Sequence, residues 1–345
     1  MLQYMANMDD NFKHAKITVI IAIYNAEKYI RRAVQSIQNQ TYDNWNLVLV
    51  DDGSTDASLM VCKELELKDH RIIVVHKENG GEASARNFGL RCATGEYICY
   101  VDADDHVEPT LLEDYITPDP TDLSICGIDM RWGARHRHVN VSPGTYYNVD
   151  IIEKLCDLDI LVIGSSCNKL YKRRIIEDNN LRFPEDQSGI GIDHTFNWQY
   201  FQLCKSLRCI ENLNYIYEEN SNSLSHERSA KDPAGYSSTR LNYMHVLYNV
   251  FDKIKDKNIR KNCQKIYHGH FSDCILRPMY IHKVTRNNRL KIIKGYIKES
   301  RRVEYKKIRV SKGLFNKSIS MICLLPINVA DMILKLIFGM KKFIR

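Results

Sequence analysis

The first hundred residues alternate apolar runs with amphipathic stretches. Ile17 to Ile23 is a continuous, mainly β-branched run, and Ala26 to Gln38 follows with apolar residues at helical spacing. Repetition of this order predicts a mostly parallel sheet with helices on both faces, which is an α/β fold. Further strands are expected over 46–51, 72–76 and 97–101, and further helices over 56–67 and 84–92.

From about Pro118 the pattern changes to mixed strands and turns. The segments 123–130 and 167–176 belong to this mixed pattern, and the apolar start LRFPE at 181–185 resembles another strand. The run RWGARHRH at 131–138 indicates a basic aromatic loop between them.

A Gly-punctuated loop over 188–191 precedes an apparent helix start at Asp193. After Asp232 the chain is predicted to be helical and basic. The chain is therefore expected to combine an α/β region with a helical C-terminal region.

The charge is distributed unevenly along the chain. Residues 231–345 carry 26 Lys and Arg against 7 Asp and Glu, whereas the preceding 230 residues carry 23 against 35. An acidic front argues against nucleic acid as its partner, and a basic rear favours phosphate-rich surfaces such as anionic lipid. With 44% hydrophobic and 26% charged residues, a largely disordered chain is excluded.

The cysteine pattern predicts the cellular compartment. The eleven cysteines show no CxxC pair and no zinc-type spacing, which predicts reduced core thiols in a cytoplasmic protein. The stretch from Met1 to Lys16 lacks the basic start and apolar run of a secretory signal. No segment reaches the roughly 18–20 apolar residues that span a bilayer.

The C-terminal segment combines apolar and basic residues. The uncharged stretch Ser318 to Ala330 is short and contains Pro326, which breaks or kinks helices. Apolar residues then follow at helical spacing among lysines, which predicts a helix lying on the inner face of the cell membrane. The competing interpretation packs this tail on the protein's own core or across a homodimer.

Polar clusters occur at the predicted carboxyl ends of three strands. They are Tyr24-Asn25, Asp51-Asp52 and the acidic run that begins at Asp102. Ligands of open α/β sheets bind beyond these strand ends, because loops and helix N-termini converge there. The alternative is that these residues only form turns and helix caps, but several acids on one rim favour a bound cation.

Two of these acids have the spacing of a metal site. Asp102 and Asp104 project to the same side in extended geometry and offer hard oxygen ligands for Mg²⁺ or Mn²⁺. Asp52 is suited to accept the ring N–H of a uracil base. Arg86, near the start of a helix, is expected either to reach a diphosphate or to form an ordinary surface salt bridge.

The sequence then shows a recognisable set of motifs. The runs ITVIIAIYNAEKYI, NLVLVDDGSTD, ENGGEASARNFGL and YICYVDADD resemble, in order and spacing, the donor domain of the family 2 glycosyltransferases. The resemblance is close over about 16–116 and looser to about 226. It implies a GT-A fold and an inverting enzyme that uses a nucleotide sugar, with a UDP-sugar the favoured donor.

The resemblance also implies roles for individual residues. Tyr24, Asn25 and Asp52 would line the nucleoside pocket, with Arg86 near the diphosphate. Asp102 and Asp104 would form the DxD motif that holds ribose, diphosphate and metal.

The family places its catalytic base in an acidic pair at the start of a later helix. Here Asp193 is retained and is expected to be the base, whereas Ile192 stands where the family commonly has Glu. Ala22 stands where Pro is common. For His136, His138 and His194 the favoured interpretation is a solvated or hydrogen-bonded imidazole rather than a ligand or base.

These features predict a domain organisation and a function. Residues 1–116 form the donor-binding half, 117–226 the acceptor-binding half with the base, and 227–345 the basic helical region. The expected activity is hexosyl transfer to a hydroxyl of a glycan or polyprenyl-diphosphate-linked acceptor in bacterial surface-polysaccharide synthesis. The alternatives are a nucleotidyltransferase and a non-catalytic protein that binds nucleotide sugars or glycans.

Overall fold

The computed structural model describes residues 15–116, 121–185, 191–218, 232–252, 254, 256–282, 284–301 and 325–340. It divides into two compact units, 1–220 and 221–345. The predicted boundaries at residues 116 and 226 stay predictions.

The first unit is built on a mixed sheet of ten strands within the described residues. Its parallel part has the order β3-β2-β1-β4, so β1 pairs with both β2 and β4. The strand order reverses between β1 and β4, which places a topological switch point there. The strands of this part are β1 (Ile17–Ile23), β2 (Trp45–Asp52), β3 (Ile72–Lys77) and β4 (Tyr97–Tyr100).

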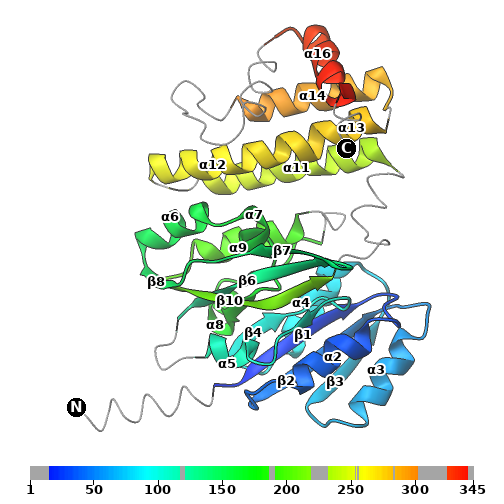
Figure 1. Ribbon diagram of the computed structural model, residues 1–345, viewed down its shortest axis with the longest axis vertical. Helices are drawn as coiled ribbons and strands as arrows, with labels where there is room; N and C mark the ends of the chain where they lie inside the picture. Colours follow the sequence, from blue (N-terminus) through cyan, green and yellow to red (C-terminus); the bar gives the residue numbers. More distant parts are fainter. Residues whose placement is uncertain are drawn as a thin grey trace. The chain divides into compact units, whose positions relative to one another are not determined.

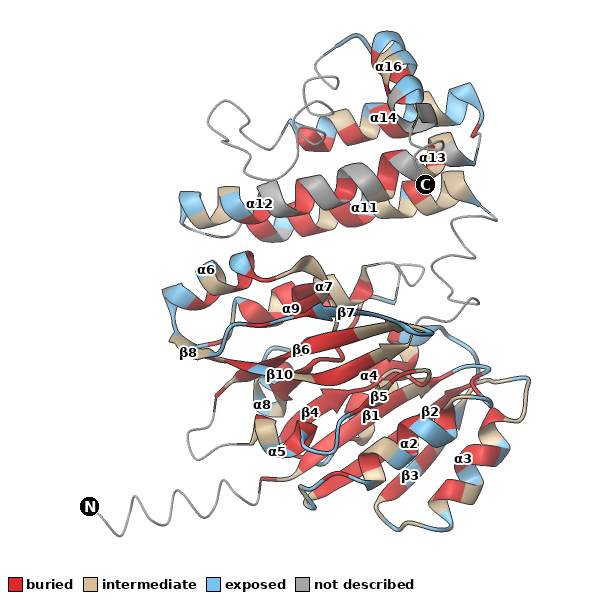
Figure 2. Cartoon of the chain, in the orientation of Figure 1, coloured by how far each residue is buried: buried red, intermediate tan, exposed pale blue. Residues whose placement is uncertain are grey.

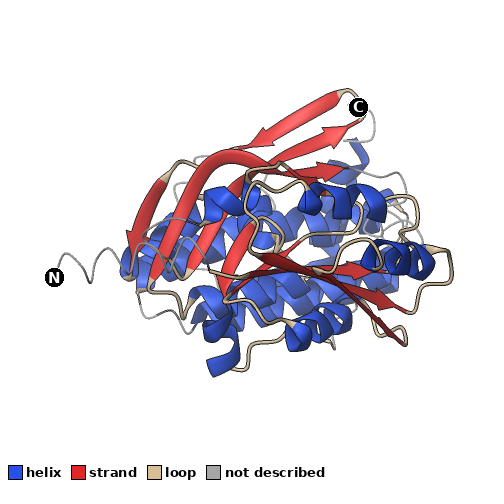
Figure 3. Ribbon diagram, turned by 90° about the horizontal axis from the view of Figure 1, so that it is seen from below, coloured by secondary structure: helices blue, strands red, loops and turns tan. Residues whose placement is uncertain are grey.

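Helices cover both faces of this part of the sheet, as expected for buried parallel strands (Figures 1 and 3). Strand β2 is buried at every position, and β1 at every position except Ala22, which is half-buried. Figure 2 shows both strands as mainly buried. In α4, a Cβ at Gly89 would lie 2.4 Å from Ile20 Cγ2, so glycine allows the helix to pack closely on β1. The helices are α2 (Ile30–Gln38), α3 (Ser58–Glu66), α4 (Glu82–Cys92) and α5 (Leu111–Tyr115).

Beyond β4 most pairings are antiparallel. Strand β9 joins β4 to β6, and β10 runs parallel to β6 and antiparallel to β5 and β8. These strands are β5 (His106–Val107), β6 (Leu123–Trp132), β7 (Arg135–Val139), β8 (Gly144–Tyr147), β9 (Lys169–Lys172) and β10 (Ser206–Glu218). The helices are α6 (Val149–Asp157), α7 (Ile160–Gly164), α8 (Arg173–Asp178) and α9 (Ile192–Phe201).

The structure corrects two predictions in this half. The segment 131–138, expected to be a loop, is the end of β6, a turn and most of β7, paired as an antiparallel hairpin. The segment 181–185, expected to begin a strand, is irregular. The side chain of Asn87 makes the hydrogen bonds that a neighbouring strand would otherwise make to this segment. It accepts from the Phe183 N–H and donates to the Phe183 carbonyl, each at 2.8 Å. Phe183 stacks on Phe196, so its apolar character serves the core.

The second unit is helical, as the sequence predicted. Its described elements are α11 (Pro233–Asp252), α12 (Lys257–Phe271), the π-helix η1 (Ser272–Leu276), α13 (Arg277–Ile281), α14 (Arg286–Ser300) and α16 (Ile327–Met340). Buried Tyr248 and Tyr296 hydrogen-bond the two ring nitrogens of His268, and burial lowers the pKa of this histidine to about 3. Among the described helices, none is long and apolar enough to cross a membrane.

Helix α16 docks through one face. Asp331 accepts hydrogen bonds from Tyr280 and Arg289 at 2.9 Å, and Ala330 and Leu334 are buried beside it. Pro326 directly precedes the helix and does not interrupt it. The rest of the predicted tail, 318–324 and 341–345, lies outside the described residues.

Candidate active site

The loop after β1 packs on the loop after β2. Asn25 has a positive φ of 52°, and its side-chain oxygen accepts from the Thr55 N–H at 2.8 Å. The Asn25 N–H in turn donates to Ser54 Oγ at 3.0 Å. Tyr24, at the end of β1, is 49% exposed. The first two predicted polar clusters therefore do lie together.

Asp52 binds the loop that leads into α4. Its carboxylate accepts from Gly80 N at 3.0 Å, Gly81 N at 2.7 Å and Lys77 Nζ at 2.6 Å. Gly53 has a positive φ of 69°, and a Cβ there would lie 2.7 Å from Asn79 N, so glycine is required at this close approach. Asp52 thus organises the Gly-rich turn, and its predicted contact with a base stays a prediction.

Arg86 joins two of the predicted site acids. Its guanidinium is 2% exposed and contacts Asp102 at 2.7 Å, Glu82 at 2.8 Å and Asp193. Asp193 lies 107 residues away in sequence. The expectation of an ordinary surface salt bridge is therefore wrong: Arg86 is a buried cation among three carboxylates. The five N–H groups of a guanidinium form a planar fork that suits such bridging.

Asp193 lies in the first turn of α9, two residues after Gly191, whose left-handed conformation begins the helix. The Asp193 side chain is 23% exposed and faces the Ser166 N–H at 3.5 Å. Burial raises the pKa of Asp193 above its ordinary value, although the charge of Arg86 acts in the opposite direction. A raised pKa makes this carboxylate a stronger base than an exposed aspartate.

The acidic run after β4 divides into accessible and buried members. Asp102 is 37% exposed, whereas Asp105 is buried and accepts from the Tyr215 hydroxyl at 2.6 Å and the Glu218 N–H at 3.0 Å. Burial, followed by the charges of Asp102 and Asp104, raises the pKa of Asp105 well above its usual range. The Tyr215 hydroxyl also accepts a hydrogen bond from the Asp102 N–H at 3.2 Å, so it holds the loop that follows β4 in place.

Sequence reasoning missed two buried residues, Lys169 and Tyr215, that hold the segments next to Asp193 and Asp102. Lys169 is buried and donates to the carbonyls of Val162 and Ser165 and to Asn168 Oδ1. It thereby holds the segment that presents Ser166 to Asp193. Burial lowers the pKa of Lys169 to about 7. Lys169 lies in β9 and Tyr215 in β10, and both are buried. The sequence does not show that these polar groups are buried, so it gave no sign of their supporting role.

The expectation of solvated or hydrogen-bonded imidazoles at the three histidines stays a prediction. His136 and His138 are half exposed and pair with Asp129. His194 lies so close to Gly164 that a Cβ there would be 2.1 Å from its ring. None of these contacts involves Arg86 or its three carboxylates.

The fold described above also occurs in solved structures. A crystal structure of Staphylococcus aureus TarS 1–349 with UDP-GlcNAc superposes with a TM-score of 0.68 at 22% identity, covering 84% of this chain and 82% of that one. The chain therefore has the GT-A fold that the sequence predicted.

Sequence comparisons then show which known proteins the chain is similar to. Residues 18–179 match the family model described as glycosyl transferase family 2. Glycosyltransferase GlyA of Streptococcus pneumoniae is 35% identical over 227 residues, 61% of this chain and 31% of GlyA. A poly(ribitol-phosphate) beta-glucosyltransferase of Bacillus spizizenii is 28% identical over 59% of this chain and 32% of its own length. The chain thus spans about a third of these two relatives.

Proposed function

We propose that this chain is a metal-dependent, inverting glycosyltransferase of the hexosyltransferase type, acting on a nucleotide sugar. The observation that carries the proposal is the buried Arg86, which holds Asp102 from the end of β4 and Asp193 from α9 on one guanidinium. Arg86 thereby holds both Asp102, the acid proposed to lie near the diphosphate, and Asp193, the candidate base. Both acids are partly exposed, Asp102 by 37% and Asp193 by 23%, so a ligand can reach them.

Asp193 is the proposed catalytic base. Inversion requires the acceptor hydroxyl to attack the anomeric carbon from the face opposite the leaving diphosphate. Asp193 would take the hydroxyl proton during this attack, and its raised pKa strengthens it for that step. Arg86 would keep the carboxylate oriented and ionised while the bond to the departing diphosphate breaks.

Asp102 and Asp104 are the proposed ligands of Mg²⁺ or Mn²⁺. The donor set fits such an ion, because carboxylate oxygens are the ligands that hard cations prefer. Asp105 is excluded as a ligand, since Tyr215 and the Glu218 N–H occupy its oxygens. When bound, the ion would neutralise charge on the diphosphate. Tyr24, Asn25 and Asp52 are proposed to line the nucleoside pocket.

The donor class is proposed to be a UDP-sugar and the acceptor a hydroxyl of a surface glycan or of a polyprenyl-diphosphate-linked glycan. The UDP-GlcNAc complex of TarS and the name of the Bacillus spizizenii relative support these two choices. Residues 1–116 are proposed as the donor-binding half, 117–226 as the acceptor-binding half, and 227–345 as the basic region.

A donor screen tests the proposed function. We expect the full chain to release UDP from one member of a UDP-sugar panel in the presence of Mn²⁺ or Mg²⁺, by transfer or slow hydrolysis. Removing the metal with a chelator should reduce release to background, and restoring it should recover the rate. Nucleoside-diphosphate release is measured directly.

Two other outcomes would replace the proposal. Pyrophosphate formed from a nucleoside triphosphate and a sugar phosphate would identify a nucleotidyltransferase. Binding of a UDP-sugar without release of UDP under any metal and acceptor would identify a non-catalytic binding protein. Ile192, which stands where the family commonly has Glu, is the feature that favours this alternative.

Peripheral attachment to the cytoplasmic face of the membrane is proposed for the second unit. Helix α16 leaves Val329, Met332 and Leu336 exposed at helical spacing, the last two by 58% and 60%. The unit around this apolar stripe is strongly basic, so anionic headgroups would hold it. Membrane contact would bring the enzyme to a lipid-linked acceptor.

Vesicle sedimentation tests this attachment. We expect Met332→Glu combined with Leu336→Glu to lower cosedimentation with vesicles of phosphatidylcholine and phosphatidylglycerol several-fold, because two charges would enter the interface. The matched control is Leu67→Glu, at a side chain 88% exposed in the first unit. Equal sedimentation of the wild type and the double variant would contradict the attachment.

A further inference from the structure

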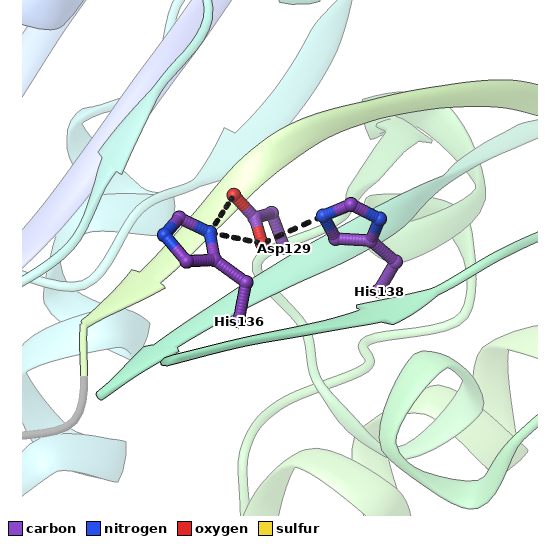
Figure 4. Close-up of side chains that lie close together, drawn as sticks. All are labelled: Asp129, His136 and His138. Carbon is purple, nitrogen blue, oxygen red and sulfur yellow. Dashed lines mark hydrogen bonds and ion pairs between the residues drawn. The ribbon is translucent and has the colours of Figure 1, made fainter. Parts of the chain in front are cut away.

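The β6–β7 hairpin brings together three metal-ligating side chains outside the proposed active site. Asp129 comes from β6, and His136 and His138 come from β7 (Figure 4). One ligand atom of each lies within 4.8 Å of those of the other two. The question is whether these residues only hydrogen-bond one another or form a site for an ion.

Strand register places the three side chains on one face. His136 and His138 are two residues apart on β7, so they project to the same side of the strand. Asp129 lies directly opposite His138 in the antiparallel pairing. Side chains directly opposite one another on paired strands are close neighbours. The cluster is therefore set by the backbone, as well as by side-chain rotamers.

The carboxylate is oriented toward the imidazoles. Arg131 Nε donates to Asp129 Oδ2 at 2.7 Å. The other oxygen, Oδ1, lies 3.3 Å from His136 Nδ1 and 3.5 Å from His138 Nε2. Partners that fix a ligating carboxylate in this way are common around metal sites.

The two carboxylate–imidazole distances are close to those around a tetrahedral ion. Bonds of about 2.0–2.1 Å to nitrogen and oxygen set the ligand atoms of tetrahedral Zn²⁺ about 3.3–3.4 Å apart. The imidazoles are about half exposed, at 45% and 55%, which leaves room for a water molecule as fourth ligand. The adjacent Arg137 is directed instead to Asp159, at 3.3 Å.

We propose that Asp129, His136 and His138 form a binding site for a divalent transition-metal ion of the Zn²⁺ class, with one position open. Two imidazoles and one carboxylate suit such an ion better than Mg²⁺, which prefers oxygen ligands. The site is thus chemically different from the proposed Asp102–Asp104 site and does not depend on it. The ion would bridge the two strands of the hairpin.

Equilibrium dialysis of the full chain, prepared without a histidine tag, tests the proposal. Zn²⁺ is the probe, and excess Mg²⁺ is present to occupy oxygen-only sites. We expect one Zn²⁺ per chain. His136→Ala and His138→Ala should each weaken binding by more than the 10–100-fold typical of losing an outer-sphere partner. Since both side chains are half exposed, these variants are expected to fold.

Two further measurements separate this site from other zinc ligands of the chain. His282→Ala, at an exposed histidine of the second unit, should bind Zn²⁺ like the wild type. Co²⁺ in place of Zn²⁺ should give the visible absorption of tetrahedral coordination, lost in both hairpin variants. The proposal is overturned if the wild type binds no Zn²⁺, or if the hairpin variants bind it as tightly as the wild type.

Discussion

Replacing Asp193 by asparagine is expected to lower sugar transfer by about 10²–10⁴-fold, the range that a positioned general base contributes. Asparagine has the shape of the protonated acid but cannot accept the proton of the acceptor hydroxyl. The UDP affinity should stay within a few-fold of the wild type, because the nucleoside contacts are proposed to come from Tyr24, Asn25 and Asp52. Steady-state UDP release and titration of UDP binding measure the two quantities.

A matched control isolates the chemistry from the change of charge. Asp178→Asn removes a carboxylate that is 62% exposed and paired with Arg174 on α8. This variant should turn over at the wild-type rate. Near-normal turnover by Asp193→Asn would show that another group takes the proton. Loss of UDP binding together with activity would instead assign Asp193 to donor binding.

Replacing Arg86 by methionine is expected to destabilise the first unit by about 3–5 kcal/mol, the cost of removing one member of a buried ion pair. Methionine fills a similar length but leaves Glu82, Asp102 and Asp193 facing one another without a cation. Denaturant unfolding followed by tryptophan fluorescence measures this change. It reports on the first unit, because Trp45, Trp132 and Trp198 are all in it.

A double variant tests whether the lost stability comes from uncompensated charge. Adding Asp193→Asn to Arg86→Met removes one of the unpaired carboxylates and should recover at least about 1 kcal/mol, since residues in one ion network are not additive. Arg174→Met, at a side chain 84% exposed, should leave the unfolding midpoint unchanged. Additive effects of the two site mutations would contradict the bridging role of Arg86.

The sequence predicted the parallel half of the fold because its signals there are local. Strand β1 was predicted with the bounds that the structure shows, Ile17–Ile23, since β-branched residues fill it without a break. The hairpin at 131–138 was missed because arginine and histidine occupy both faces of β7, so no apolar alternation marks it. Leu181 and Phe183 led to a strand prediction that was wrong, because they are buried in the core although their segment is irregular.

The candidate site was predictable only in part. The order of the motifs predicted Asp102 as part of the DxD motif and Asp193 as the base. The parallel topology brings the ends of β1, β2 and β4 to one rim of the sheet. The bridge through Arg86 could not be predicted, because it joins residues 107 positions apart through tertiary packing. The supports Lys169 and Tyr215 depend in the same way on contacts that no local pattern encodes.

A crystal structure of the full chain with UDP and Mn²⁺ tests the central claim most directly, since the anomalous signal of manganese locates the ion without ambiguity. We predict Mn²⁺ between the diphosphate and the carboxylates of Asp102 and Asp104, the uracil base beside Asp52, and Asp193 on the far side of the position for the sugar. UDP bound in a place from which neither Asp102 nor Asp193 can be reached would contradict the proposed site and the function built on it.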